Sequence, residues 1–211
     1  MRIHQIYYDF SMENKPMPEM FSELQKKVKL FASKNGYSYK FWNKKKLDSL
    51  LNKYPQYKKL VNNVRYEIMK VDIMKYLILH NEGGIYLDMD LEPKLKKLKD
   101  YEFAVSTNPG TPKYNNDVIQ AKKGDEKLLD VIDYIETQIK EKSKISVYDN
   151  RKFRYVLHTT GPQALVRFLK LIKYKPQEYR VNNASTNPPK MNLIGNEDFL
   201  DFPSALWGKF F

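Results

Sequence analysis

The stretch GGIYLDMDLEP, Gly83 to Pro93, places two glycines before a short apolar run and three acids after it. The acids Asp88, Asp90 and Glu92 occupy every second position. Paired glycines favour a tight turn, and a short apolar run bounded by such a turn is typical of a buried strand. The chain has a formal net charge of +12, so carboxylates gathered at one strand end call for a specific partner.

A divalent cation is the partner that best suits this pattern. In a straight strand Asp88 and Asp90 point the same way, with carboxylates within about 7 Å of each other. Such like charges repel and raise one pKa, whereas Mg²⁺ or Mn²⁺ removes the repulsion. Ligands of open α/β sheets bind beyond the carboxyl ends of the strands, so we expect this metal to hold a phosphate or diphosphate. The alternative is an exposed strand end with solvated acids.

The same stretch predicts how its other side chains lie. Gly83 and Gly84 are expected to form a tight turn from a helix into the strand. Ile85 and Leu87 are expected to face the core, and Tyr86 to share the face of the acids.

Length and composition predict one α/β domain over residues 1–211. The chain is 42% hydrophobic and 14% aromatic, which is enough for a sizeable core. It has no cysteine, which excludes disulfides and thiolate metal sites. The N-terminal MRIHQIYYDF lacks a secretory signal pattern, and no window approaches about 20 apolar residues. We therefore expect a cytoplasmic protein.

The positive charge comes mainly from lysines spread along the chain. There are 37 Lys and Arg against 25 Asp and Glu, and the pI is about 9.5. A solvated lysine-rich surface explains this, and so does attraction to phosphate ligands, to an anionic membrane or to nucleic acid. Charge alone does not separate these alternatives.

Periodicity predicts a β-α-β opening, with a strand at 3–8, a helix at 20–36 and a strand at 37–43. This order is typical of a parallel sheet with crossover helices. The later elements expected are short helices across 44–63, a helix at 64–80, strands at 85–89, 101–107 and 117–123, a helix at 126–142, an extended run at 153–158, a helix from Pro162 after Gly161, and a possible strand at 191–195.

The segment VDIMKYLILHNEGGIYLDMDLEP, residues 71–93, resembles the sugar-binding region of DXD-containing glycosyltransferases, a group that includes glycosyltransferase family 32. The residues that carry this resemblance are Asp72, Lys75, Gly83, Gly84, Tyr86, Asp88 and Asp90. Weaker similarity follows in the family's order at IHQIYY, YKFWN, NDVIQAKKGDEKL and TTGPQALVRFL. The resemblance implies a GT-A fold, which is a Rossmann-like, mostly parallel sheet flanked by helices.

It also implies that Asp88 and Asp90 hold Mn²⁺ or Mg²⁺ on the diphosphate of a nucleotide-sugar. Asp90 is then the expected direct ligand, and Asp88 contacts ribose, sugar or metal-bound water. The metal would stabilise the leaving nucleoside diphosphate as a Lewis acid.

Further donor-binding roles follow from the resemblance. Asp72 would contact nucleoside or sugar hydroxyls, although a helical ion pair with Lys75 is the alternative. The family usually has Arg at the position of Lys75, and Lys lacks the bidentate fork of Arg. Tyr7 would stack on the base, or be an ordinary buried strand tyrosine, and Tyr86 would cover the base or ribose.

Later segments supply the remaining candidates. His158, expected at a strand-to-helix turn, is a possible third metal ligand, or a histidine that fixes the turn. Gly161 could offer its N–H to an anion. Asn116 would lie near the sugar, and Asp117 is the candidate catalytic base. Other candidates are Arg151, Arg154 and Arg167 as phosphate contacts and Trp207 as a lid.

The leading hypothesis is therefore a metal-dependent glycosyltransferase that uses a UDP- or GDP-sugar, with UDP favoured. The acceptor would be a glycan, a lipid-linked or a protein-linked group, and the lysine surface could hold the protein at an anionic membrane. The alternatives are a metal-dependent nuclease or phosphotransferase and a non-catalytic nucleotide-sugar-binding module. Nucleic acid is disfavoured because no lysine-rich stretch with interleaved aromatics surrounds the acids.

Overall fold

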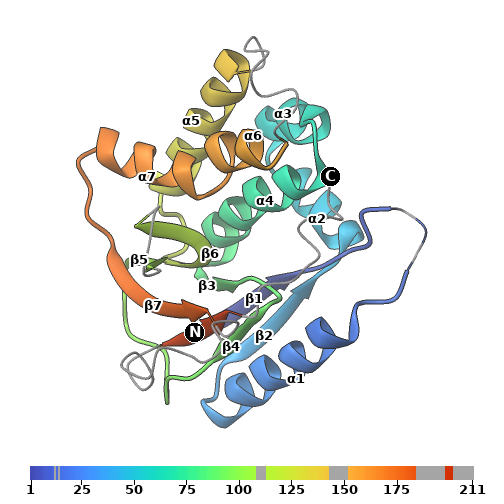
Figure 1. The fold of residues 1–211 in the computed structure, drawn as a ribbon, viewed down its shortest axis with the longest axis vertical. Helices are drawn as coiled ribbons and strands as arrows, with labels where there is room; N and C mark the ends of the chain where they lie inside the picture. Colours follow the sequence, from blue (N-terminus) through green and yellow to red (C-terminus); the bar gives the residue numbers. More distant parts are fainter. Residues whose placement is uncertain (12, 14, 108–112, 143–151, 184–197, 202–211) are drawn as a thin grey trace.

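Figure 1 shows the fold in a computed structural model, which describes residues 1–11, 13, 15–107, 113–142, 152–183 and 198–201. The elements in chain order are β1 (Arg2–Ile6), α1 (Glu19–Lys34), β2 (Ser38–Trp42), α2 (Lys44–Leu51), the 3₁₀ turn η1 (Pro55–Tyr57), α3 (Lys58–Asn63), α4 (Glu67–Glu82), β3 (Gly84–Leu87), β4 (Leu91–Pro93), β5 (Phe103–Thr107), β6 (Tyr114–Ala121), α5 (Lys127–Lys142), α6 (Lys152–Thr159), α7 (Pro162–Leu171), β7 (Gln177–Asn183) and β8 (Phe199–Asp201).

The strands of the described ranges form one eight-stranded sheet in the order β2-β1-β3-β6-β5-β7-β8-β4. β1 is parallel to both β2 and β3, and β7 is parallel to both β5 and β8. β6 runs antiparallel to β3 and β5, and β4 runs antiparallel to β8. The sheet is thus mixed but mostly parallel, and the predicted β-α-β opening is confirmed as β1-α1-β2.

Helices cover both faces of this sheet (Figure 1). α1 packs on one face, where Val28 shares a core cluster with Ile85 and Leu87 of β3. α4 lies on the other face, where Tyr86 joins the larger cluster formed with α2, α5 and α7. Because both faces are covered, Ile85, Tyr86 and Leu87 are all buried. β3 is therefore an interior strand, which lies between β1 and β6 and is covered on both faces.

Two glycines turn the chain from α4 into β3, as the sequence predicts. Gly83 has φ +65° and Gly84 has φ +106°, which side-chain-bearing residues rarely adopt. The N–H of Gly83 donates to the carbonyl of Leu79 at 2.7 Å and ends the helix. A Cβ on Gly84 would lie 2.3 Å from the carbonyl oxygen of Arg2, so β1 and β3 can approach only where residue 84 is glycine.

His4 packs within β1 and joins this turn to the first two strands. Its ring is buried and contacts the Gly83 carbonyl through Nε2 at 2.9 Å, while Nδ1 accepts from Trp42 Nε1 at 3.1 Å. Burial lowers the pKa of His4 to about 4, so the ring is neutral at pH 7. Because Trp42 can only donate, Nδ1 must be the acceptor and Nε2 carries the proton.

The segment 153–158 is helical, so the prediction of an extended run there is wrong. Tyr155, Val156 and Thr159 are buried at helical spacing along α6, and this burial overrides the strand propensity of the aromatic and β-branched residues. Three short strands, β4, β7 and β8, were also not predicted. In β7 the buried residues Tyr179 and Val181 alternate in the usual way, which is a signal that the sequence offered. The possible strand at 191–195 lies outside the described residues.

Within the described ranges, no helix is both long and apolar enough to cross a bilayer.

Replacement of Gly84 by alanine should cost about 3 kcal/mol or more of unfolding free energy, because the backbone of β1 must move to admit a methyl group. Gly36→Ala is the matched control, because Gly36 also has positive φ, at +68°, but nothing lies within 4 Å of its Cβ position. That variant should lose only about 1 kcal/mol. Urea unfolding of both proteins measures the difference, and equal losses would contradict the close approach of β1.

Candidate functional site

The acidic pair lies at the carboxyl end of β3, where the strand stops. β3 ends at Leu87, and residues 88–90 turn, with the N–H of Leu91 donating to the carbonyl of Asp88 at 3.4 Å. Asp88 and Asp90 are therefore not carried on one straight strand, as the alternation predicted. Met89 between them is buried, and both acids are half-buried. The turn leaves the two side chains at the sheet edge, where ligands of such folds bind.

Asp88 is held in place by its neighbours on β3 and α4. The Tyr86 hydroxyl donates to Asp88 Oδ1 at 2.7 Å, which confirms that Tyr86 shares the side of this acid. The Lys75 ammonium lies 3.6 Å from the same oxygen and 5.0 Å from the centre of the Tyr86 ring. Burial raises the pKa of Asp88, and the charge of Lys75 opposes that rise. The contacts with Tyr86 and Lys75 thus both fall on one oxygen of this carboxylate, Oδ1.

Lys75 forms a buried ion pair with Asp72, one turn away on α4. Nζ lies 3.1 Å from Asp72 Oδ1 and donates to the Asn116 carbonyl at 3.0 Å, and its side chain is 2% exposed. Burial lowers the pKa of Lys75, but the Asp88 and Asp72 carboxylates outweigh it and the pKa is raised. The helical ion pair considered above is therefore present, and it lies in the interior.

A bulge in β6 directs Asn116 toward this pair. The register between β5 and β6 shifts after Val105, so that Ser106 pairs with Asn115. Bulges re-aim side chains in this way beside functional sites. Asn116 is buried, and its amide donates to Asp72 Oδ1 at 3.0 Å.

Asp117 is buried on the same bulge and is bonded within the sheet. Its Oδ1 accepts from the N–H of Val118 at 2.8 Å and from the hydroxyl of Ser106. Its Oδ2 accepts from the amide of Asn115 at 2.9 Å. Its carbonyl accepts from the N–H of Asp88 at 2.9 Å, so Asp117 also joins β6 to the acidic turn. These bonds shape the bulge, and the role of Asp117 as a base stays a prediction.

Thr160, which the sequence analysis did not single out, completes the surroundings of Asp72. Its hydroxyl donates to Asp72 Oδ2 at 2.8 Å, and its side chain is fully buried. Gly161 follows, and its N–H donates to the Val156 carbonyl at 2.9 Å. The N–H that was assigned to an anion is thus bonded within the α6–α7 turn.

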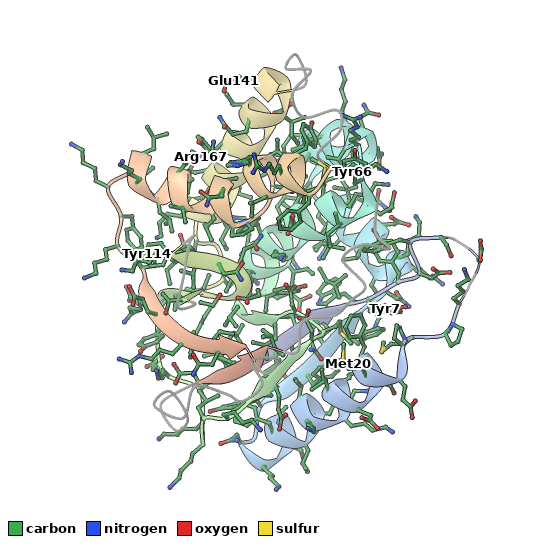
Figure 2. All side chains as sticks on the ribbon, in the orientation of Figure 1. Tyr7, Met20, Tyr66, Tyr114, Glu141 and Arg167 are labelled. Carbon is green, nitrogen blue, oxygen red and sulfur yellow. The ribbon has the colours of Figure 1, made fainter. Side chains whose placement is uncertain are left out.

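The structure does not bring His158 together with the acidic pair. His158 lies in the last turn of α6, not after a strand, and its Nδ1 faces the guanidinium of Arg167. Figure 2 shows Arg167 on the helical layer above the sheet. No group of three or more His, Asp or Glu side chains in the described ranges is arranged to hold a metal ion. Arg151 and Trp207 lie outside those ranges.

Aromatic side chains follow β1 at the same edge of the sheet. Tyr7 is half-buried and packs edge-on against Phe21 of α1, with ring centres 5.9 Å apart (Figure 2). Its N–H donates to the Trp42 carbonyl at 3.1 Å, which extends the pairing of β1 and β2. The neighbouring Tyr8 donates through its hydroxyl to Glu67 in the first turn of α4 at 3.0 Å. Tyr7 is therefore partly packed against the protein and partly exposed, and its role in stacking on the base stays a prediction.

Comparison with known proteins identifies the central segment. Residues 18–104 match the family described as the glycosyltransferase sugar-binding region containing the DXD motif. Inositol phosphoceramide mannosyltransferase 1 of Schizosaccharomyces pombe is 31% identical over 91 residues, which make up 42% of this chain and 27% of that protein. The chain thus matches about a quarter of the relative's length. The matched region contains Asp72, Lys75, Asp88 and Asp90, and it ends before Asn116.

Two solved structures share the fold. The PaToxG glycosyltransferase has a TM-score of 0.54 at 18% identity, over 81% of this chain and 68% of that one. A glycosyltransferase involved in the glycosylation of the major capsid of PBCV-1 has a TM-score of 0.50 at 12% identity, over 95% of this chain and 92% of that one. The expected GT-A fold and the resemblance to DXD-containing glycosyltransferases are confirmed.

Replacement of Lys75 by methionine should cost about 3–5 kcal/mol of unfolding free energy at pH 8, because two carboxylates lose their buried counter-charge. Lys70→Met on the same helix is the control, since Lys70 pairs with Glu67 near the surface, where its side chain is 24% exposed. That change should cost less than about 1 kcal/mol. Urea unfolding compares the two, and similar losses would contradict the central place of Lys75.

Proposed function

From a chain that has the GT-A fold and the sugar-binding region of a DXD-containing glycosyltransferase, we propose metal-dependent transfer of a hexose or deoxyhexose from a nucleoside-diphosphate sugar. The observation that carries the proposal is the placement of Asp88 and Asp90 at the end of β3, with Asp88 fixed by Tyr86 and Lys75. Asp72 bonds to Asn116 and is joined to Asp88 through Lys75, and we assign Asp72 and Asn116 to the sugar of the donor.

The residues present fit Mn²⁺ or Mg²⁺. Asp88 has its hydrogen bond and its ion pair on Oδ1, and Asp90 lies two residues on in the same turn. Mg²⁺ is usually bound by one or two protein carboxylates, with substrate phosphates and water completing its shell. A two-carboxylate site therefore agrees with the finding that, in the described part of the chain, no group of three or more acids and histidines is arranged to hold a metal ion. When bound, the ion would stabilise the charge of the leaving nucleoside diphosphate.

The rest of the donor site follows the edge of the sheet. Tyr7 at the end of β1 would face the base, and UDP is favoured over GDP as the nucleotide. Tyr86, predicted to cover the base or ribose, is buried and would act through its hydroxyl, which keeps Asp88 oriented. The Nδ1 of His158 faces Arg167 and the N–H of Gly161 bonds to the Val156 carbonyl, so this proposal assigns neither of these two groups to the metal or the diphosphate.

The proposed acceptor is a glycan or a glycolipid. A glycolipid is supported by the matched relative, whose name gives mannosyl transfer to inositol phosphoceramide. The excess of lysine suits a peripheral contact with an anionic membrane.

Asp117 is the proposed base for the acceptor hydroxyl. Asp117→Asn should lower turnover by about 100-fold or more, while the affinity for the donor stays within about twofold, because only proton transfer is lost. Steady-state turnover and donor titration measure the two quantities. If turnover per folded molecule persists and only thermal stability falls, Asp117 serves the β6 bulge and a different group accepts the proton.

Metal-dependent nucleotide binding is the direct test of the proposed function. UDP or GDP should raise the melting temperature of the wild type only when Mn²⁺ is present, since a ligand that binds the folded state stabilises it by mass action. Asp88→Asn and Asp90→Asn should lose this rise. Differential scanning fluorimetry with UDP, GDP, CMP and dTDP measures it and identifies the base.

Glu92→Gln is the matched control for that experiment. Glu92 continues the alternating acids, but its carboxylate forms ion pairs with Lys27 at 3.0 Å and with Lys94 at 2.8 Å. This variant should keep the full Mn²⁺-dependent rise. If no nucleotide shifts the wild type while duplex or single-stranded DNA does, the glycosyltransferase proposal fails and the nuclease alternative replaces it.

A further inference from the structure

We propose that Thr160 is a positioning residue of the sugar subsite, which fixes the Asp72 carboxylate for recognition of the donor sugar. This inference rests on the proposed function and adds a residue from the α6–α7 turn, beyond the matched segment 18–104. The contact joins residues 88 positions apart in the sequence. It makes the α6–α7 turn a wall of the donor site.

The Asp72 carboxylate is held from three directions. Oδ1 accepts from the Asn116 amide at 3.0 Å and lies 3.1 Å from the Lys75 ammonium. Oδ2 accepts from the Thr160 hydroxyl at 2.8 Å. A hydroxyl that donates to a carboxylate forms a charge-assisted hydrogen bond, which is stronger than one between neutral groups. Thr160 is therefore the group that fixes the second oxygen and, with it, the plane of the carboxylate.

The turn around Thr160 is built to aim this hydroxyl at α4. The N–H groups of Thr160 and Gly161 both donate to the Val156 carbonyl, at 3.0 and 2.9 Å. A Cβ on Gly161 would lie 3.1 Å from Cα of Leu157, so the turn is closely packed there. Pro162 then fixes the start of α7. The backbone thus leaves Thr160 little freedom.

The consequence concerns the sugar and not the nucleotide. Asp72 is 5% exposed, so only a ligand group in the right direction can reach it. A carboxylate oxygen has two lone pairs, and Thr160 uses one of those on Oδ2. Its removal lets the carboxylate turn, which weakens bonds to sugar hydroxyls but leaves the contacts of the base and diphosphate at Tyr7, Asp88 and Asp90 unchanged.

The chain itself offers a matched control, the adjacent Thr159. Both side chains are fully buried, and each hydroxyl donates one hydrogen bond. Thr159 donates to the Tyr155 carbonyl at 2.7 Å, within α6, whereas Thr160 donates to Asp72. Replacement of either by valine removes one hydroxyl and keeps the shape. Only Thr160→Val removes a bond to Asp72.

The experiment is isothermal titration of the wild type, Thr160→Val, Thr160→Ser and Thr159→Val in the presence of Mn²⁺. The ligands are UDP, UDP-glucose, UDP-galactose, GDP and GDP-mannose. For the nucleotide-sugar that the wild type binds, the Kd of Thr160→Val should rise about five- to tenfold, which is the net effect of losing one typical hydrogen bond. Its Kd for the matching nucleoside diphosphate should stay within about twofold. Thr160→Ser and Thr159→Val should resemble the wild type.

The outcomes separate this proposal from the proposed function. If the wild type binds none of the five ligands, the proposed function fails and the role of Thr160 fails with it. If the wild type binds a nucleotide-sugar and Thr160→Val changes neither Kd, or changes both equally, the role of Thr160 alone is overturned. An equal loss in Thr159→Val would likewise assign the effect to packing of α6. If Thr160→Val does not fold, Thr160→Ala carries the same expectation.

Discussion

The arrangement of this site depends on one buried ammonium, that of Lys75. The Lys75 side chain is 2% exposed and lies within 3.6 Å of carboxylates on both sides, Asp72 and Asp88. Removing a charge from water costs several kcal/mol, and the cost is offset only by good geometry and further hydrogen bonds. The protein provides these from β3, β6 and the α6–α7 turn, whose contacts with Asp72 and Asp88 all serve the same cluster. The pairing of the Lys75 ammonium with its two carboxylates thus depends on the arrangement of these three elements.

The glycine turn brings the two carboxylates to one cation. From Asp72 the chain descends 11 residues of helix to Gly83, about 16 Å at the helical rise, and β3 returns about 13 Å over the four residues from Gly84 to Asp88. The two distances nearly cancel, so residues 16 apart in sequence end at the same height. The positive φ values of Gly83 and Gly84 allow the chain to reverse direction, so that β3 returns beside α4. The spacing between Asp72 and Asp88 is therefore set by helix and strand geometry.

Local geometry of this kind explains which residues of the site could be predicted from the sequence. Helical spacing pairs Asp72 with Lys75 and strand alternation pairs Tyr86 with Asp88, whereas the resemblance to the DXD-containing family was needed to join the two pairs in one site. The position of Asn116 depends on a three-residue bulge in β6, and bulges leave no periodic signal. Thr160 contacts Asp72 across 88 residues, and such a contact becomes visible only when the layers are packed. The extended run expected at 153–158 was wrong for the same reason, because burial of Tyr155 and Val156 in a cluster with Met69 of α4, and not local propensity, decided the conformation of this segment.

The presence of Lys in place of the family's usual Arg has a definite effect on the chemistry. A lysine ammonium has three N–H donors and an arginine guanidinium has five. Here the ammonium lies within hydrogen-bond distance of Asp72 Oδ1 and the Asn116 carbonyl and 3.6 Å from Asp88, and the side chain is 2% exposed, so Lys75 is directed at these protein oxygens. An arginine in the same position would still have donors to offer to a sugar hydroxyl. Under the proposed function, recognition of the sugar then falls on acceptors, above all on the Asp72 carboxylate, and the groups that fix its plane become decisive for which sugar is bound.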